Sequence, residues 1–283
     1  MIVVIAGATA TGKSQIAIKL AKEFNGYILN ADSRQVYKEL NIGTAKPSKE
    51  EIDASKVKHK LFGYVSIDED YNLYRYQKDA FKVLEERENQ NAFLVGGTGL
   101  YIDSVVYNYK LKKGDKGNRK ELEKLSLKQL QKKVGKDLEK LNQSDKQNPR
   151  RLIRFLEREK QKYEKGNSLE HIYFVLEKDF NILEKDIKER VNDMFEKGLL
   201  EENERLFKEG KHEKINTIGY KEFEEFFKGD ITLDEVKERI FVNTRKYAKR
   251  QITWFKRNEN AIWVKDYDGI YNNLKSLITS LKS

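Results

Sequence analysis

The 283-residue sequence contains no cysteine, only two prolines and only three histidines. A disulfide framework and a cysteine-ligated zinc site are therefore excluded, and three scattered histidines do not form a metal centre. Long apolar runs are missing as well. The N-terminal apolar run is too short for a signal peptide, and no stretch of about 18 apolar residues follows it. We therefore expect a cytoplasmic protein that does not enter a membrane.

Charged residues are abundant, at 36% of the chain, and the formal net charge is +10. Residues 109–170 hold 20 Lys and Arg against 10 Asp and Glu, a difference of +10, so the rest of the chain is near neutral. A basic segment favours a polyanionic partner such as RNA or DNA, because binding releases counterions. A solvated, lysine-rich helical surface has the same composition, so the charge count leaves both interpretations open.

The stretch Gly7–Ser14 matches the phosphate-binding pattern G-x-x-x-x-G-K-[ST] at every position. A strand is predicted before it and a helix over 15–24 after it, which is the context that the motif requires. In such a loop, backbone N–H groups surround a diphosphate or triphosphate, Lys13 reaches the outer phosphate, and Ser14 ligates Mg²⁺. The predicted loop residues are Gly7, Ala8, Thr9, Ala10, Thr11, Gly12, Lys13 and Ser14.

Apolar strands alternate with amphipathic helices along the rest of the chain. The strands are predicted at 2–5, 26–31, 92–95 and 171–176, with a possible strand at 61–67. The helices are predicted at 15–24, 71–89, 119–125, 127–141, 182–198 and 199–209, with one more beginning at Pro149 and a last one beginning at the capping box of Thr232 and Glu235. This order predicts an α/β fold: a P-loop kinase-like parallel sheet flanked by helices, with a mainly helical insertion. We place the catalytic core at 1–111 and 171–283, and the basic insertion at 112–170.

Asp32 follows the strand at 26–31, at the sheet edge where ligands collect in open α/β folds. After the strand at 92–95, the chain has Gly96-Gly97-Thr98 where a nucleotide hydrolase usually carries a carboxylate for Mg²⁺, which argues against ordinary ATP hydrolysis. The glycines suggest close approach of the backbone to a flat or bulky acceptor. Asp32 can orient a hydroxyl in a kinase, or accept a proton from an amine in an alkyl transfer that releases diphosphate. The missing carboxylate and the basic segment favour the second reaction.

Two sets of basic residues lie at helical spacing. Arg150, Arg151 and Arg154 follow Pro149 beside apolar residues, and their guanidinium groups suit bidentate phosphate contact better than lysine does. An amphipathic surface helix is the alternative. Arg245 and Lys249 are one turn apart on the last predicted helix. That pair can bind a phosphate or be a solvated surface pair, and spacing does not decide between them.

Six blocks, in order along nearly the whole chain, together resemble bacterial tRNA dimethylallyltransferases. They are Gly7–Ser14, Asn30–Tyr37 (NADSRQVY), Ile42–Pro47 (IGTAKP), Val95–Tyr101 (VGGTGLY), Asn148–Leu152 (NPRRL) and Asn243–Phe255 (NTRKYAKRQITWF). The phosphate loop is shared by many families, but the other blocks are specific. The chain departs from the family at His59-Lys60, where paired histidines are common, and at Tyr76, where phenylalanine is common. We assign no role to these residues.

The resemblance implies transfer of a dimethylallyl group from dimethylallyl diphosphate to N6 of the adenine just 3′ of the tRNA anticodon, with release of diphosphate. By this resemblance Asp32 is the general base, Arg245 and Lys13 steady the diphosphate, and Ser14 with Mg²⁺ completes the diphosphate site. The implied tRNA contacts are Asp32, Ser33, Arg34, Gln35, Thr98, Arg119, Arg150, Arg151 and Arg154. We expect the protein to be a monomer.

Two other functions fit the same residues. A small-molecule enzyme, either a nucleotide kinase or an adenylate isopentenyltransferase, can use the same fold, but it needs no basic insertion. An RNA-binding protein can use the phosphate loop only as a nucleotide sensor, but Asp32 at the strand end argues against it.

Overall fold

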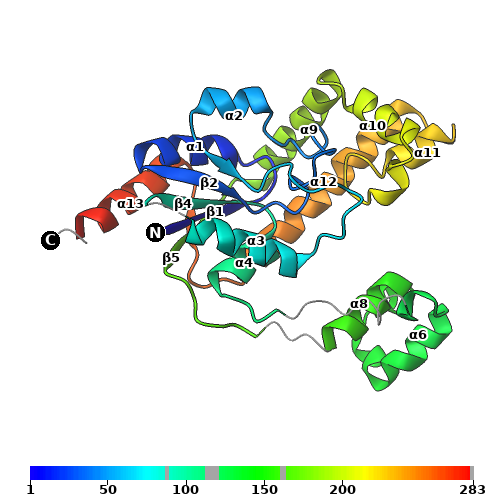
Figure 1. Ribbon diagram of the computed structural model, residues 1–283. Helices are drawn as coiled ribbons and strands as arrows, with labels where there is room; N and C mark the ends of the chain where they lie inside the picture. Colours follow the sequence, from blue (N-terminus) through cyan, green and yellow to red (C-terminus); the bar gives the residue numbers. More distant parts are fainter. Residues whose placement is uncertain (87–88, 112–120, 160–163, 281–283) are drawn as a thin grey trace. The chain divides into compact units, whose positions relative to one another are not determined.

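The computed structural model describes residues 1–86, 89–111, 121–159 and 164–280. The chain forms two compact units (Figure 1). The large unit comprises Met1–Val106 and Leu169–Ser283, and the small unit comprises Tyr107–Ser168. Within the described ranges, no helix has both the length and the apolar character needed to cross a bilayer.

The large unit contains a six-stranded sheet in which every pair of neighbouring strands is parallel, in the order β3-β2-β4-β1-β5-β6. The strands are β1 (Ile2–Gly7), β2 (Gly26–Asn30), β3 (His59–Lys60), β4 (Asn91–Gly96), β5 (His171–Leu176) and β6 (Ile262–Val264). All residues of the central strand β1 are buried, as its continuous apolar run requires in a sheet that helices cover on both faces. The predicted α/β fold with a parallel sheet is confirmed.

Helices pack on both faces of the sheet (Figure 1). The helices of the large unit are α1 (Lys13–Glu23), α2 (Lys49–Ser55), α3 (Leu73–Glu85), α4 (Gly99–Val106), α9 (Phe180–Glu196), α10 (Leu199–Lys208), α11 (Phe223–Phe227), α12 (Leu233–Phe255) and α13 (Tyr267–Ser280), with the short 3₁₀ turn η2 (His212–Lys214). Side chains of α1 and α13 share one apolar cluster with Val3 and Ile5 of β1. On α3 and α4, Tyr76 stacks on Tyr101 with 3.9 Å between ring centroids, and the Tyr76 hydroxyl donates to the Asn30 carbonyl of β2.

The small unit is helical and has its own apolar cluster, which includes Leu122, Leu130 and Leu152. Its elements are α6 (Leu127–Val134), the 3₁₀ turn η1 (Gly135–Lys140), α7 (Gln143–Lys146) and α8 (Pro149–Glu159). The single helix predicted at 127–141 is wrong. Gly135 at φ 63° ends α6, because a left-handed residue cannot continue a right-handed helix. Part of the helix predicted at 119–125 lies outside the described residues.

Two other predictions about elements need correction. The possible strand at 61–67 is not formed: β3 stops at Lys60, because Leu61 and Gly63 have φ of 64° and 53°, and Val65 makes only an isolated bridge to Tyr37. The helix with the Thr232–Glu235 capping box is present as α12, with the cap formed as predicted. It is not the last element, since β6 and α13 follow it and extend the sheet and its apolar cluster.

Candidate active site

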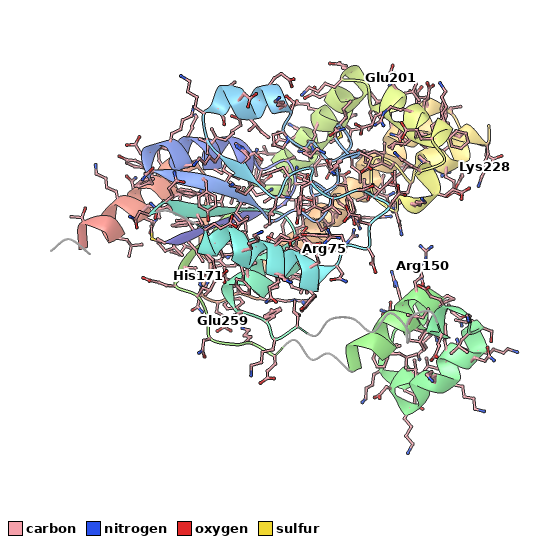
Figure 2. All side chains as sticks on the ribbon, viewed as in Figure 1. Arg75, Arg150, His171, Glu201, Lys228 and Glu259 are labelled. Carbon is pink, nitrogen blue, oxygen red and sulfur yellow. The ribbon has the colours of Figure 1, made fainter. Side chains whose placement is uncertain are left out.

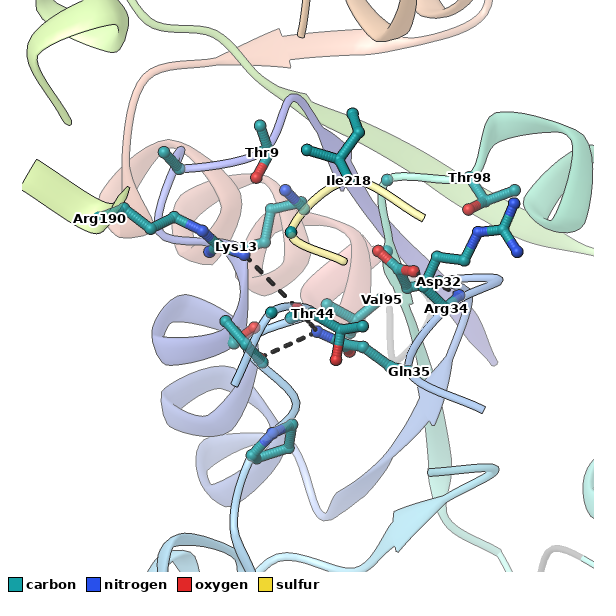
Figure 3. A pocket seen from close by; sticks show the side chains of 18 of the residues that line it. Thr9, Lys13, Asp32, Arg34, Gln35, Thr44, Val95, Thr98, Arg190 and Ile218 are labelled. Carbon is teal, nitrogen blue, oxygen red and sulfur yellow. Dashed lines mark hydrogen bonds between the residues drawn. The ribbon is translucent and has the colours of Figure 1, made fainter. Parts of the chain in front are cut away.

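A pocket of about 1000 Å³ lies at the carboxyl edge of the sheet (Figure 3). It is lined by the loops after β1, β2 and β4, by residues of α9 and α12, and by the segment at 43–47. The residues predicted from the sequence that line it are Thr9, Ala10, Gly12, Lys13, Ser14, Asp32, Ser33, Arg34, Gln35 and Thr98. The structure thus brings the phosphate loop and the Asp32 segment into one cavity, as expected where parallel strands end.

The phosphate loop presents the uncapped beginning of α1 to this pocket. Gly12 occupies the helix N-cap at φ 82° and makes no side-chain cap, and Ala10 also has a positive φ, of 63°. The first N–H groups of α1 therefore lack a side-chain partner at the cap and form a site for an anion. Gly7, Ala8 and Thr11 do not line the pocket but form the base of the loop, where the Thr11 hydroxyl donates to the Ala8 carbonyl at 2.9 Å.

Lys13, Arg190 and Asp32 interact electrostatically within the pocket. The Lys13 amine donates to the Ala8 carbonyl at 2.5 Å. Burial and, to a smaller extent, the nearby Arg190 guanidinium lower the pKa of Lys13 to about 7, and Asp32 opposes this shift. Arg190 extends from α9 into the pocket (Figure 3), where burial lowers the pKa of its guanidinium and Asp32 again opposes the shift. An anion that approaches both cations replaces solvation that they have lost.

The segment from Asp32 is fixed by hydrogen bonds to the loop after β4. The Ser33 N–H donates to the Thr98 hydroxyl at 3.0 Å, and the Thr98 N–H donates to the Ala31 carbonyl at 3.2 Å. One Asp32 carboxylate oxygen accepts the N–H of Arg34 at 2.8 Å. The other oxygen is available for a proton or a donor in the pocket. Tyr247 of α12 completes this wall, and burial, with a contribution from Asp32, raises its pKa to about 12.

Gln251 of α12 joins the phosphate loop to the loop after β4. Its side-chain carbonyl accepts the N–H of Thr9 at 2.9 Å, and its amide N–H donates to the Gly97 carbonyl at 2.9 Å. A Cβ at Gly97 would lie 2.1 Å from the Gln251 amide nitrogen, and one at Gly99 would lie 2.1 Å from the Trp254 ring. Gly97 and Gly99 therefore leave room for side chains of α12, while close approach of an acceptor to Gly96 and Gly97, which line the pocket, stays a prediction.

The structure does not bring Arg245 to the pocket lining. Its guanidinium pairs with Glu184 at 2.9 Å and lies over the Phe180 ring, on the α9 side of α12. Arg250, which lies five residues further on, does line the pocket. The physical reason is helical phase: Ala248, Gln251 and Phe255 are the buried face of α12, and this face turns Arg245 toward α9.

The remaining predicted arginines belong to the small unit. Arg119 lies outside the described residues, as does the side chain of Arg154. Arg150 is exposed on α8 and extends outward from its unit (Figure 2). Arg151 is also exposed and pairs with Asp145 at 2.5 Å.

Sequence reasoning missed Arg190, Tyr247 and Gln251 as site residues. Arg190 had a readable signal. It lies seven residues after Leu183 and three after Ile187, on the stripe that α9 buries, where a charge needs a partner or a ligand. Tyr247 and Gln251 had no such signal. Helical spacing shows which residues share a face of α12, but it does not show which of these faces meets a pocket.

Comparison with known proteins places these features in one family. A family model described as IPP transferase matches residues 35–258, and a second one, described as isopentenyl transferase, matches residues 1–61. The chain is 36% identical to the tRNA dimethylallyltransferase of Flavobacterium johnsoniae, over the whole of this chain and 98% of the relative.

Solved structures agree with the sequence relatives. The chain is similar to the full-length tRNA isopentenylpyrophosphate transferase of Bacillus halodurans, with a TM-score of 0.74 and 32% identity over 99% of this chain and 95% of that one. It is also similar to a eukaryotic dimethylallyltransferase described as acting on tRNA, with a TM-score of 0.73 and 27% identity over 94% of this chain and 74% of the other.

The pKa of Lys13 gives a testable prediction about anion binding. A bound diphosphate favours charged Lys13, so binding must raise its pKa from about 7 and take up a proton above that pH. Affinity for an alkyl diphosphate should therefore fall as the pH rises above 7. Calorimetry at pH 8 in two buffers of different ionisation enthalpy measures the proton uptake.

Lys13→Arg is the control, since arginine keeps its charge throughout this range. The Lys13→Arg variant should therefore bind the alkyl diphosphate with a smaller proton uptake than the wild-type protein. Equal uptake by both proteins would mean that Lys13 is not the titrating group.

Proposed function

The chain belongs to the IPP transferase family, and we propose that the pocket described above holds both substrates of a tRNA dimethylallyltransferase. The enzyme transfers the dimethylallyl group of dimethylallyl diphosphate to N6 of the adenine 3′-adjacent to the anticodon and releases diphosphate. The observation that supports the shared pocket is the single cavity that Lys13 and Ser14 line together with Asp32 and Thr98. A proton acceptor beside a diphosphate site is what an alkyl transfer to an amine requires.

The diphosphate binds at the beginning of α1. The N–H groups of the loop point at its oxygens, and Lys13 and Arg190 balance its charge. As the allylic carbon–oxygen bond breaks, negative charge grows on the leaving diphosphate, so these cations act most strongly in the transition state.

A divalent cation, which we propose to be Mg²⁺, fits the same end of the pocket. The Ser14 side chain is exposed there next to Lys13, and a hydroxyl oxygen suits a hard cation. The described residues contain no cluster of three acidic, histidine or cysteine side chains able to hold a metal by themselves. Ser14 would hold the ion together with substrate phosphate oxygens and water. The ion supplies charge neutralisation to the diphosphate.

Asp32 acts as the general base in the same pocket. The adenine N6 attacks the allylic carbon, a carbon–nitrogen bond forms, the carbon–oxygen bond to diphosphate breaks, and the N6 proton passes to the Asp32 carboxylate. The hydrogen bond from Arg34 N–H to one oxygen fixes the carboxylate so that the second oxygen faces the cavity. Ser33, Arg34, Gln35 and Thr98 contact the nucleotide, which must leave its stacked position to enter.

The small unit carries the basic surface for the rest of the tRNA. We assign Arg150, Arg151 and the remaining basic residues of 109–170 to phosphate contacts, supported by the exposure of Arg150 and Arg151 and by the +10 charge of this segment. We also propose that the enzyme is a cytoplasmic monomer.

Asp32→Asn tests the reaction. Mass analysis of tRNA after incubation with wild-type protein, Mg²⁺ and dimethylallyl diphosphate should show one dimethylallyl group added, and AMP should not be a substrate. Asn keeps the shape of Asp32 but cannot take the proton, so the single-turnover rate should fall by roughly 10²- to 10⁴-fold. Affinity for tRNA should stay within a few-fold. An unchanged rate would remove Asp32 as the base, and wild-type turnover of AMP would favour the small-molecule enzyme.

A pair of arginine variants tests the diphosphate end. Arg190→Gln should lower kcat by roughly 10²- to 10³-fold, as removal of one charge-stabilising donor does, and Arg190→Lys should restore part of it. Arg245→Gln is the matched variant outside the pocket lining. It should change kcat little, because Arg245 pairs with Glu184. A larger loss in Arg245→Gln than in Arg190→Gln, with both proteins folded, would restore the role that the sequence resemblance gave to Arg245.

A further inference from the structure

Glu202 is a buried carboxylate outside the pocket. It lies on α10, is 7% exposed, and accepts the backbone N–H groups of Asn41, Ile42 and Gly43 at 3.1–3.3 Å. It also accepts the Tyr220 hydroxyl at 2.5 Å. In the described part of the chain, Glu202 forms no ion pair with a lysine or arginine. Four hydrogen-bond donors therefore surround its carboxylate, and Lys46 interacts with it electrostatically from a greater distance than an ion pair.

This arrangement ties residues 41–45, which we call the 41–45 loop, to α10. A buried charge is tolerated only when its oxygens are hydrogen-bonded, so the loop must keep its N–H groups turned toward Glu202. Close packing adds to this constraint, since a Cβ at Gly43 would lie 2.6 Å from the Tyr220 ring. The first half of the loop therefore has one conformation.

The second half of the same loop holds pocket side chains. The Gln35 amide donates to the carbonyls of Thr44 and Ala45, both at 3.0 Å. The Arg190 guanidinium donates to the Thr44 carbonyl at 3.5 Å. Figure 3 shows Arg190 and Gln35 converging on Thr44 from different elements. Gln35, Thr44 and Arg190 all line the pocket, whereas Glu202 does not.

We propose that Glu202 is a positioning residue for transfer to tRNA: it fixes the 41–45 loop so that the Thr44 and Ala45 carbonyls orient the Gln35 amide. The inference rests on the proposed function, in which Gln35 contacts the nucleotide. The bond to Arg190 is longer than the two bonds to Gln35, so the effect of Glu202 passes mainly through Gln35 and reaches the tRNA side of the pocket more than the diphosphate side.

Glu202→Gln tests the proposal. The amide keeps the shape of the side chain but places an NH₂ group against backbone donors, so the 41–45 loop loses its fixed conformation. We expect kcat/KM for tRNA to fall by up to roughly 10²-fold, as small misplacements near a site do. The Kd of dimethylallyl diphosphate, measured without tRNA, should change no more than about threefold. Glu201→Gln is the control, because Glu201 precedes Glu202 but is exposed and points outward (Figure 2).

A double-mutant cycle separates positioning from stability. If Glu202 acts through Gln35, Glu202→Gln should lower kcat/KM for tRNA only slightly further in a Gln35→Ala background. The effects of the two substitutions are then not additive. Leu206→Val removes a methylene from the apolar cluster that Leu206 shares with Tyr220. It should lower Tm without lowering kcat/KM. Additive effects in the cycle, or an equal kinetic loss in Leu206→Val, would overturn the proposal and leave the proposed function intact.

Tyr220→Phe replaces Glu202→Gln if the latter does not fold. It removes one donor to Glu202 and keeps the ring that packs on Gly43. It should lower kcat/KM for tRNA by a smaller factor, and Gln35→Ala should suppress this loss. A loss that persists in full in the Gln35→Ala background would equally overturn the proposal. Failure of the wild-type protein to modify tRNA at all would instead refute the proposed function.

Discussion

The two hydrogen bonds of Gln251 are the constraint on which the site depends. They connect the phosphate loop, through Thr9, to the loop after β4, through Gly97, although Gln251 is 242 and 154 residues away from these partners in the sequence. One buried amide thus fixes the distance between the loop that we propose to hold the leaving group and the loop that we propose to face the acceptor. Gly97 has no side chain because Gln251 occupies that space. The reaction needs this fixed distance, since donor carbon and acceptor nitrogen must meet in line.

The charged side chains of the pocket lie on and beside the elements that Gln251 connects. Lys13 and Arg190 have lost part of their solvation, and the pKa of Lys13 falls to about 7 as a result. In the proposed function, a diphosphate bound near both side chains offsets the cost of burying two cations together. Asp32 is the opposing charge. Its position at the end of β2, beside Thr98, places a proton acceptor next to the cations without a direct ion pair to them in the described structure.

Local sequence patterns predicted the parts of this protein that local physics determines. The phosphate loop, the parallel strands and the Thr232 cap follow from motif, apolar runs and capping residues, and the structure shows each of them. The break after Lys60 was missed because it comes from left-handed backbone at Leu61 rather than from a recognisable turn sequence. Arg190, Gln251 and Glu202 were missed for another reason: their partners are distant in the sequence, and helical spacing gives the faces of α9, α10 and α12 but not what each face meets. The same limit explains Arg245, whose spacing fitted a phosphate contact and whose partner is Glu184.

The single-turnover transfer rate of Gln251→Leu tests the central role of this side chain most directly. Leucine has a similar volume but leaves the Thr9 N–H and the Gly97 carbonyl without their partner, and each unsatisfied buried group costs about 1–3 kcal/mol. If Gln251 holds the two loops at a fixed distance, the single-turnover transfer rate of the variant should fall by at least roughly tenfold. Saturating concentrations of both substrates should not restore this rate. A folded Gln251→Leu protein that transfers the dimethylallyl group at the wild-type rate would contradict this account.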